Sequence, residues 1–231
     1  MLLSIHPKDP EPRKIRIAVE KLNAGGVVIC PTDTVYAFVC SAHQPRAIEQ
    51  VAKLKGAKPN KADLSLICND LSQLSTYARA VDTAAFRIMK RALPGPYTFI
   101  LPASNEIPKL FKNNKRTVGI RVPDHPIPLA LVAELGHALV VASVHDPDKV
   151  VDYTTDPERI DEHLGYQVDL VIDGQRPESP SMVGGGDLRR ALEGLAAGGF
   201  RVRPWFEPGP WGGQWCRRHI AELPPAPNYA W

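Results

Sequence analysis

The chain has 231 residues, of which 44% are hydrophobic and 23% charged, a composition that excludes a protein disordered throughout. Its 28 lysines and arginines exceed its 25 acidic residues by a formal charge of only +3, so bulk charge does not indicate a nucleic-acid-binding protein. This length accommodates one large domain with an appendage.

Cysteines and apolar runs indicate the compartment. The four cysteines, Cys30, Cys40, Cys68 and Cys216, form no Cys-x-x-Cys pair and no metal-type spacing with the histidines. We therefore expect free thiols and no metal ion bound by protein side chains. No apolar run reaches the roughly 18 residues of a membrane span, and the first residues do not resemble a signal peptide. We expect a soluble cytoplasmic protein that binds no membrane, or one of an organelle matrix if a targeting peptide has been removed.

Helical and strand-like patterns alternate along most of the chain. Between positions 11 and 23 apolar residues recur at helical spacing, and Gly25-Gly26 ends the run, which predicts an amphipathic helix. Residues 27–30, closed by Pro31, predict a strand buried on both faces. Further helices are expected around 47–51, 84–89, 127–135 and 157–164, and strands at 64–68, 98–101, 118–121, 139–142 and 168–172. This order predicts an α/β fold in which helices flank a mixed sheet.

The composition changes after Gly174. Prolines occur at 177 and 180, three glycines occupy 184–186, and all four tryptophans lie beyond Phe200 without a period that would bury them together. Residues 189–197 can form one more helix. We interpret 187–231 as an atypical Pro/Gly/Trp-rich C-terminal extension, extended or dependent on a partner, that follows a domain spanning 1–186.

A polar hexapeptide, Pro31-Thr32-Asp33-Thr34-Val35-Tyr36, directly follows the first predicted strand. Ligands of open α/β sheets bind at the carboxyl ends of strands, where two hydroxyls and a carboxylate can hold a small polar substrate. The alternative is a polar turn in which Asp33 caps a short helix. The residue types alone leave both interpretations open.

Several segments together resemble one family. Residues 26–36 read Gly-Val-Val-Ile-Cys-Pro-Thr-Asp-Thr-Val-Tyr, and a lysine-rich stretch near Lys55, then 94–98, 119–123, Ser143 and 180–183, follow in order. These segments resemble the YrdC-like family, whose members make threonylcarbamoyl-adenylate, over about Ile5 to Val183. Residues 6–10, 64–72 and 97–101 are most similar to its YciO-like branch.

The resemblance implies a YrdC-like twisted mixed sheet and a defined reaction. L-Threonine, bicarbonate and ATP, with magnesium accompanying the ATP, would give threonylcarbamoyl-adenylate and pyrophosphate for modification of adenosine 37 in tRNA. The residues implied to bind threonine are Thr34, Thr98, Arg121 and Ser181, and those implied to bind the nucleotide are Lys53, Lys55, Ser143 and His145. Arg121 ends its predicted strand, where it can bind a carboxylate bidentately; a structural salt bridge is the alternative.

The chain departs from the family pattern in ways that bear on activity. The expected Lys-x-Arg corresponds here to Lys53-Leu54-Lys55 or to Lys55-Gly56-Ala57, neither of which contains arginine, and His145 replaces the asparagine of Ser-x-Asn. Phe38 lies where the family has small, glycine-rich residues after the tyrosine, so its ring is expected close to the pocket. The alternative is that Phe38 fills the core. A second hypothesis is therefore a catalytically weak or inactive YrdC-like domain. Such a domain would bind tRNA or double-stranded RNA through basic clusters, or act as a subunit of a larger assembly that docks a protein partner through the C-terminal tail. The basic residues in question include Lys109, Lys112, Lys115 and Arg116.

Overall fold

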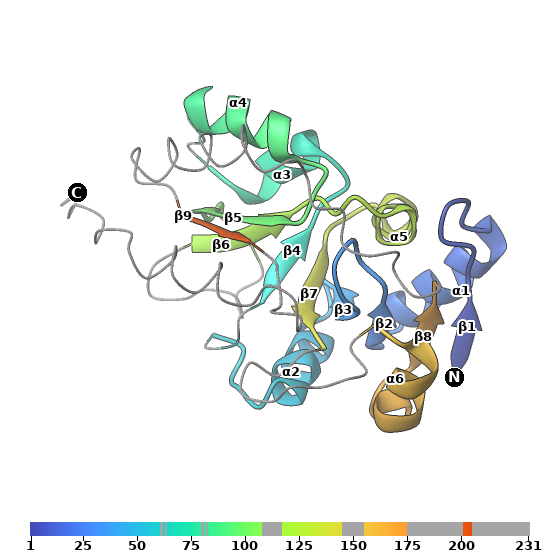
Figure 1. Cartoon of the computed structure of the whole chain (residues 1–231). Helices are drawn as coiled ribbons and strands as arrows, with labels where there is room; N and C mark the ends of the chain where they lie inside the picture. Colours follow the sequence, from blue (N-terminus) through green and yellow to red (C-terminus); the bar gives the residue numbers. More distant parts are fainter. Residues whose placement is uncertain are drawn as a thin grey trace, which may run out of the picture.

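A mixed β-sheet runs through the computed structural model of the chain (Figure 1). The structure describes residues 1–60, 62, 64–79, 81, 83–107, 117–144, 155–174 and 201–204, the last four by their backbone alone. Within these residues nine strands follow the order β1-β8-β2-β3-β7-β4-β6-β5-β9. They are β1 (Leu2–Ser4), β2 (Val28–Cys30), β3 (Ala37–Ser41), β4 (Ser65–Ile67), β5 (Tyr97–Pro102), β6 (Thr117–Arg121), β7 (Leu139–Ser143), β8 (Leu170–Asp173) and β9 (Arg201–Pro204). The pairs β1–β8, β2–β8 and β4–β6 are parallel and the others antiparallel, so the predicted mixed sheet is confirmed.

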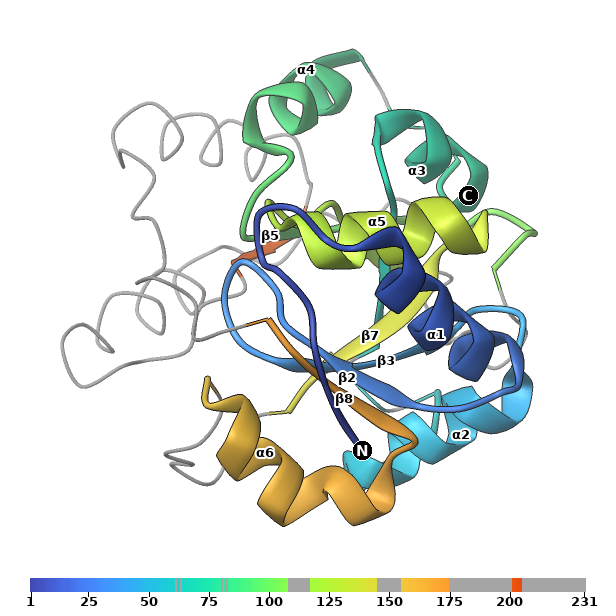
Figure 2. The same cartoon turned by 90° about the vertical axis from the view of Figure 1, so that its right-hand side faces the viewer.

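Helices cover both faces of this sheet (Figure 2). On one face α1 (Pro12–Asn23) packs beside α5 (Pro126–Leu135). Across the sheet from α5 in Figure 2 lie α2 (Pro45–Leu54) and α6 (Pro157–Leu164), and α6 leads into a short 3-10 helix, Gly165–Gln167. Helices α3 (Leu71–Tyr77) and α4 (Thr83–Ala92) lie beyond α5 in this view and contribute to the apolar cluster that also contains residues of α2 and α6. None of the helices in the described part of the chain is long and apolar enough to cross a membrane.

The central strands are apolar on both sides, as predicted for residues 27–30. Val28 and Cys30 belong to the apolar cluster under α1 and α5, whereas Ile29 belongs to the cluster on the other face. Phe38 in β3 is 3% exposed and lies in that second cluster, so it fills the core. Cys30, Cys40 and Cys68 are buried free thiols, as expected; Cys216 lies outside the described residues.

Three short strands and one helix were not predicted from the sequence. They are β1, β3, β9 and α3. Strand β9 lies within the predicted extension 187–231 and pairs with β5, so four residues of that segment add a strand to the sheet. The expected helix at 189–197 lies outside the described residues.

Candidate functional site

The loop between β2 and β3 is the hexapeptide singled out in the sequence, and its own hydroxyls fix its shape. Thr32 Oγ1 donates to the carbonyl oxygen of Val35 at 2.7 Å and accepts from the Thr34 N–H at 3.2 Å. The two threonine hydroxyls lie 3.1 Å apart, and Thr32 and Thr34 are 1% and 7% exposed. The loop is therefore a closed polar turn at the carboxyl end of a buried strand.

Counting protons assigns the direction of the hydroxyl contact. A threonine hydroxyl carries one proton, and that of Thr32 is committed to Val35, so Thr34 donates to Thr32. The lone pairs of Thr34 Oγ1 remain as acceptors. Thr34 is therefore suited to accept a hydrogen bond from an ammonium or hydroxyl group of a ligand.

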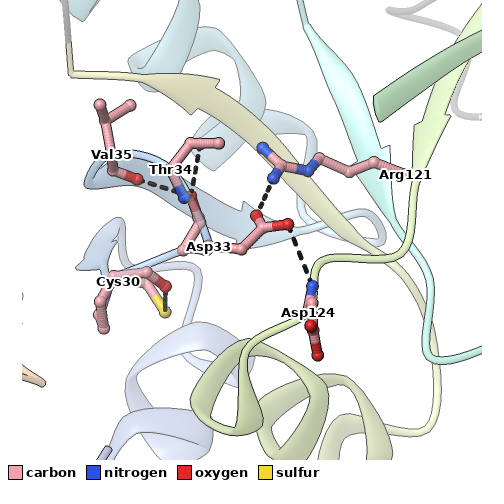
Figure 3. A network of polar contacts seen from close by, with 8 residues as sticks. Cys30, Asp33, Thr34, Val35, Arg121 and Asp124 are labelled. Atoms are coloured by element: carbon pink, nitrogen blue, oxygen red, sulfur yellow. Dashed lines mark hydrogen bonds and ion pairs between the residues drawn. The ribbon is translucent and has the colours of Figure 1, made fainter. Parts of the chain in front are cut away.

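Asp33 links this loop to the end of β6 (Figure 3). One carboxylate oxygen, Oδ1, accepts from Nη2 of Arg121, and the other, Oδ2, accepts from the Asp124 N–H at 3.1 Å. The carboxylate therefore bridges two segments rather than capping a helix, so the alternative of a helix-capping Asp33 is wrong. Arg121 does form the ion pair that its alternative interpretation, a structural salt bridge, predicts.

The ion pair is shielded from water. The side chain of Arg121 is 0% exposed and that of Asp33 is 8% exposed. Burial lowers the pKa of the Arg121 guanidinium, and the charge and hydrogen bond of Asp33 offset part of that shift. A guanidinium held in this way offers planar, charge-assisted donors in a medium of low dielectric, where an added carboxylate is bound more strongly than at a surface.

Helix α5 begins beside the ion pair. His125 is its N-cap residue, and the His125 Nδ1 accepts from the Ile127 N–H at 3.2 Å. Burial lowers the pKa of His125, opposed by the charges of Asp33 and Asp124. Since a capping Nδ1 must accept, the imidazole is neutral in this arrangement. The amino end of α5 thus adds its positive dipole end to the charge of Arg121.

Strands β8 and β7 close the loop from two other sides. Gly174 follows β8, and its N–H donates to the Tyr36 hydroxyl at 3.3 Å. A Cβ on Gly174 would lie 2.6 Å from Pro31 Cγ, so only glycine allows this approach. Ser143, at the end of β7, pairs with Ala37, the first residue of β3. The predicted nucleotide-binding residue Ser143 is therefore adjacent to the loop in the sheet.

The remaining predicted site residues are distributed as follows. Thr98 in β5 is 3% exposed. Strand β5 pairs with β6, the strand that ends at Arg121. Lys53 is exposed in the last turn of α2, and Lys55, the C-cap residue, is half-buried. Ser181 and His145 lie outside the described residues. The structure thus brings Thr34 and Arg121 together through Asp33 and places Ser143 beside their loop.

Sequence reasoning named the hexapeptide but did not assign Asp33 a binding partner. A signal was available: an arginine that ends a predicted strand of the sheet needs a carboxylate partner if it is buried, and the motif contains one. The contribution of the α5 terminus had no such signal, because His125 and Asp124 gain their role only from the packing of α5 against the loop.

Both carboxylate oxygens of Asp33 accept hydrogen bonds, one from Arg121 and one from the Asp124 N–H. Among the described residues no three His, Cys, Asp or Glu side chains gather as a metal site.

Comparison with known proteins places this geometry in a family. Residues 20–183 match the Sua5/YciO/YrdC family model, described as "Telomere recombination". The uncharacterized protein YciO of Escherichia coli (strain K12) is 42% identical over 172 residues, which are 74% of this chain and 82% of YciO. The crystal structure of E. coli YciO gives a TM-score of 0.71 at 38% identity and covers 77% of this chain and 85% of YciO.

Two more distant relatives have names that state an activity or a ligand. The threonylcarbamoyl-AMP synthase of Nitrosococcus oceani is 30% identical over 161 residues, 70% of this chain and 85% of the synthase. The P. abyssi Sua5 structure complexed with L-threonine gives a TM-score of 0.69 at 27% identity and covers 76% of this chain and 51% of Sua5. The fold, the hexapeptide and these matches confirm the resemblance seen in the sequence, and the chain belongs to the Sua5/YciO/YrdC family.

Proposed function

We propose that this chain is a threonylcarbamoyl-adenylate synthase that serves the modification of adenosine 37 in tRNA. The observation that carries the proposal is the buried Asp33–Arg121 pair, positioned by the same loop that presents the acceptor oxygen of Thr34. Buried charge of this kind is costly unless it is paired, and it is frequent where a charged ligand must be bound. The threonylcarbamoyl-AMP synthase relatives and the threonine complex of Sua5 support the choice of ligand.

In this proposal the amino acid binds by its two charged groups. The carboxylate of L-threonine pairs with Arg121, whose orientation Asp33 fixes, and the amino group donates to Thr34 Oγ1. A guanidinium has five N–H donors and can hold two carboxylates at once. Asp33 and the substrate can therefore share Arg121.

The chemistry requires two bond-forming steps. The threonine amine attacks bicarbonate carbon and, with loss of water, gives a carbamate. A carbamate oxygen then attacks the α-phosphorus of ATP, and the bond to the β-phosphate oxygen breaks to release pyrophosphate. Magnesium would arrive with the triphosphate as its counterion. The contribution of this chain is to position the amine and carboxylate and to exclude water from the mixed anhydride.

Nucleotide binding is expected from Lys53, Lys55, Ser143 and His145. The lysines act on phosphates as point charges, whereas the Lys-x-Arg of the family supplies a planar fork. We therefore expect ATP to bind more weakly than in family members that carry the arginine, by roughly tenfold for one lost charge-assisted hydrogen bond.

The test is an assay of product formation. Purified protein is incubated with ATP, magnesium, bicarbonate and L-threonine, while pyrophosphate release and threonylcarbamoyl-adenylate are followed, the latter by mass spectrometry. We expect both products to depend on threonine. Pyrophosphate release at the same rate without threonine, or the absence of both products from a folded sample, would contradict the proposal.

The arginine-free Lys53-Leu54-Lys55 favours a second candidate, a catalytically weak domain that binds RNA. That role predicts retention of tRNA that falls steeply as salt rises, because lysine contacts to phosphates release counterions. Measurement of tRNA affinity at two salt concentrations, alongside the product assay, separates the two candidates.

A further inference from the structure

The exposed large apolar side chains of the described residues lie at two ends of the molecule. Phe86, on α4, is 42% exposed, and Tyr166, just after α6, is 82% exposed. The other two are Met1 and Leu2, and the Met1 amino group lies 3.7 Å from Asp161 of α6. Helices α4 and α6 occupy opposite ends of the molecule in both views (Figures 1 and 2). Since exposed aromatic residues often anchor interfaces, both ends are candidate contact surfaces.

The outer side of α4 is basic. Residues 83–92 contain three basic residues and no acidic residue: Arg87, Lys90 and Arg91. All three are exposed, and none forms an ion pair within the described part of the chain. Lys90 follows Phe86 by about one helical turn, so the aromatic ring and the cations share one side of α4, the basic face. The helix dipole favours cations near the end of α4 but does not account for an exposed phenylalanine among them.

The outer side of α6 has the opposite charge. Residues 157–164 contain three acidic residues and one basic residue: Glu158, Asp161, Glu162 and Arg159. Glu158 and Glu162 are exposed, lie about one helical turn apart, and form no ion pair with another described residue. Tyr166 comes four residues after Glu162, in the 3-10 helix that continues from α6. Glu158, Glu162 and Tyr166 form the acidic face.

We propose that the chain associates head to tail with copies of itself, the basic face of one copy contacting the acidic face of the next. Each face combines an exposed aromatic ring with charges that complement those of the other face. A nucleic acid would account for the basic face alone, whereas a second copy accounts for both faces. This contact does not depend on the proposed enzymatic activity, since neither face contains a residue of the Arg121 site.

The geometry also determines the kind of assembly. Two different faces meet, so the contact is heterologous, and copies add at either end instead of closing into a two-fold dimer. Two helical faces bury less than the roughly 1,000 Å² of a stable interface, so the association is weak. It should grow with protein concentration and fall as salt screens the charges.

The experiment is sedimentation velocity on wild type, on Arg87→Glu/Lys90→Glu and on Glu158→Lys/Glu162→Lys. We expect the average mass of wild type to rise with protein concentration at 0.1 M salt. The association constant should fall roughly tenfold or more at 1 M salt, where the screening length drops from about 10 Å to about 3 Å. Each variant alone should stay monomeric, because its two faces then have like charge. An equimolar mixture of the two variants should associate again, because every contact in it can join opposite charges.

The control is Arg13→Glu/Arg16→Glu, which reverses two exposed cations of α1 and changes the net charge as much as the α4 variant does. This control should associate as wild type does. If a reversed variant fails to fold, Arg87→Gln/Lys90→Gln and Glu158→Gln/Glu162→Gln replace the pair, and each should weaken association.

Four results would overturn the proposal. The first is a wild type that stays monomeric at every concentration in low salt, and the second is a mixture of the folded variants that remains monomeric. The third is an equal loss of association in the α1 control, which would make net charge the cause. The fourth is an α4 variant that loses retention of tRNA while its self-association is unchanged, which would assign the basic face to nucleic acid.

Discussion

Arg121 and Asp33 are the residues on which the site depends. The sequence drew attention to each of them but did not predict that they form an ion pair. The family motif points to Arg121, and the position of Asp33 between two threonines draws attention to it. Their ion pair joins residues 88 positions apart in the chain, a contact that no local pattern encodes. The proton count that makes Thr34 an acceptor likewise needs coordinates, because it depends on the 2.7 Å bond between Thr32 and Val35.

Removal of Arg121 should destabilise the domain as well as the site. Arg121→Ala leaves the carboxylate of Asp33, only 8% exposed, without its cation, and breaking a buried pair costs about 3–5 kcal/mol. Urea unfolding followed by circular dichroism measures this loss. Lys14→Ala, which breaks an exposed ion pair with Glu11, is the control and should change the unfolding free energy little. Equal, small losses in both variants would show that the Asp33–Arg121 pair is solvated.

Helices and strands with strong apolar periodicity were predicted close to their observed bounds. The helices expected at 127–135 and 157–164 are Pro126–Leu135 and Pro157–Leu164 in the structure. Strand β3 was missed because all five of its residues are buried, so it lacks the alternation that marks a half-exposed strand. Strand β1 was missed because three residues carry too little pattern to recognise.

The amino terminus of α5 should make stability depend on pH. Burial lowers the pKa of His125 from 6.5 in the folded protein, so the unfolded chain binds the proton more readily. Stability from the neutral cap is fully present above about pH 7 and is lost as the pH falls through 6.5 towards the folded-state pKa. His125→Asn keeps a capping acceptor that does not titrate. Its melting temperature should match that of wild type near pH 8 and fall less by pH 5.5.

His137, whose pKa is also lowered, mainly by burial, stays in both proteins, so the difference between the two melting curves isolates His125. Parallel loss of stability in wild type and His125→Asn would contradict a neutral capping histidine.

At the scale of the whole molecule, the sheet includes β9, which belongs to the segment predicted to be an atypical extension. This strand was not predicted because prolines and glycines surround residues 201–204 in the sequence and because its partner, β5, lies about a hundred positions earlier. The α/β class, by contrast, was evident because alternating elements leave few other architectures.

Strand β9 should protect the edge of the sheet. A chain that ends at Phe200 lacks β9 and leaves β5 with an unpaired edge, whereas a chain that ends at Pro204 retains the pairing. We expect the shorter chain to melt at a lower temperature and to scatter more light at high concentration. Identical melting and scattering of the two chains would show that β9 contributes nothing to the domain.

The central claim, that the Arg121 site makes threonylcarbamoyl-adenylate, is tested most directly with carbon-13 bicarbonate. Wild type and Arg121→Lys are incubated with ATP, magnesium, L-threonine and the labelled bicarbonate, and the mass of the adenylate is measured by mass spectrometry. We predict one labelled carbon in the wild-type product, and a loss of roughly a hundredfold in Arg121→Lys, which keeps the charge but not the planar fork. Absence of labelled adenylate from folded wild type, or its formation at the wild-type rate by Arg121→Lys, would contradict the account.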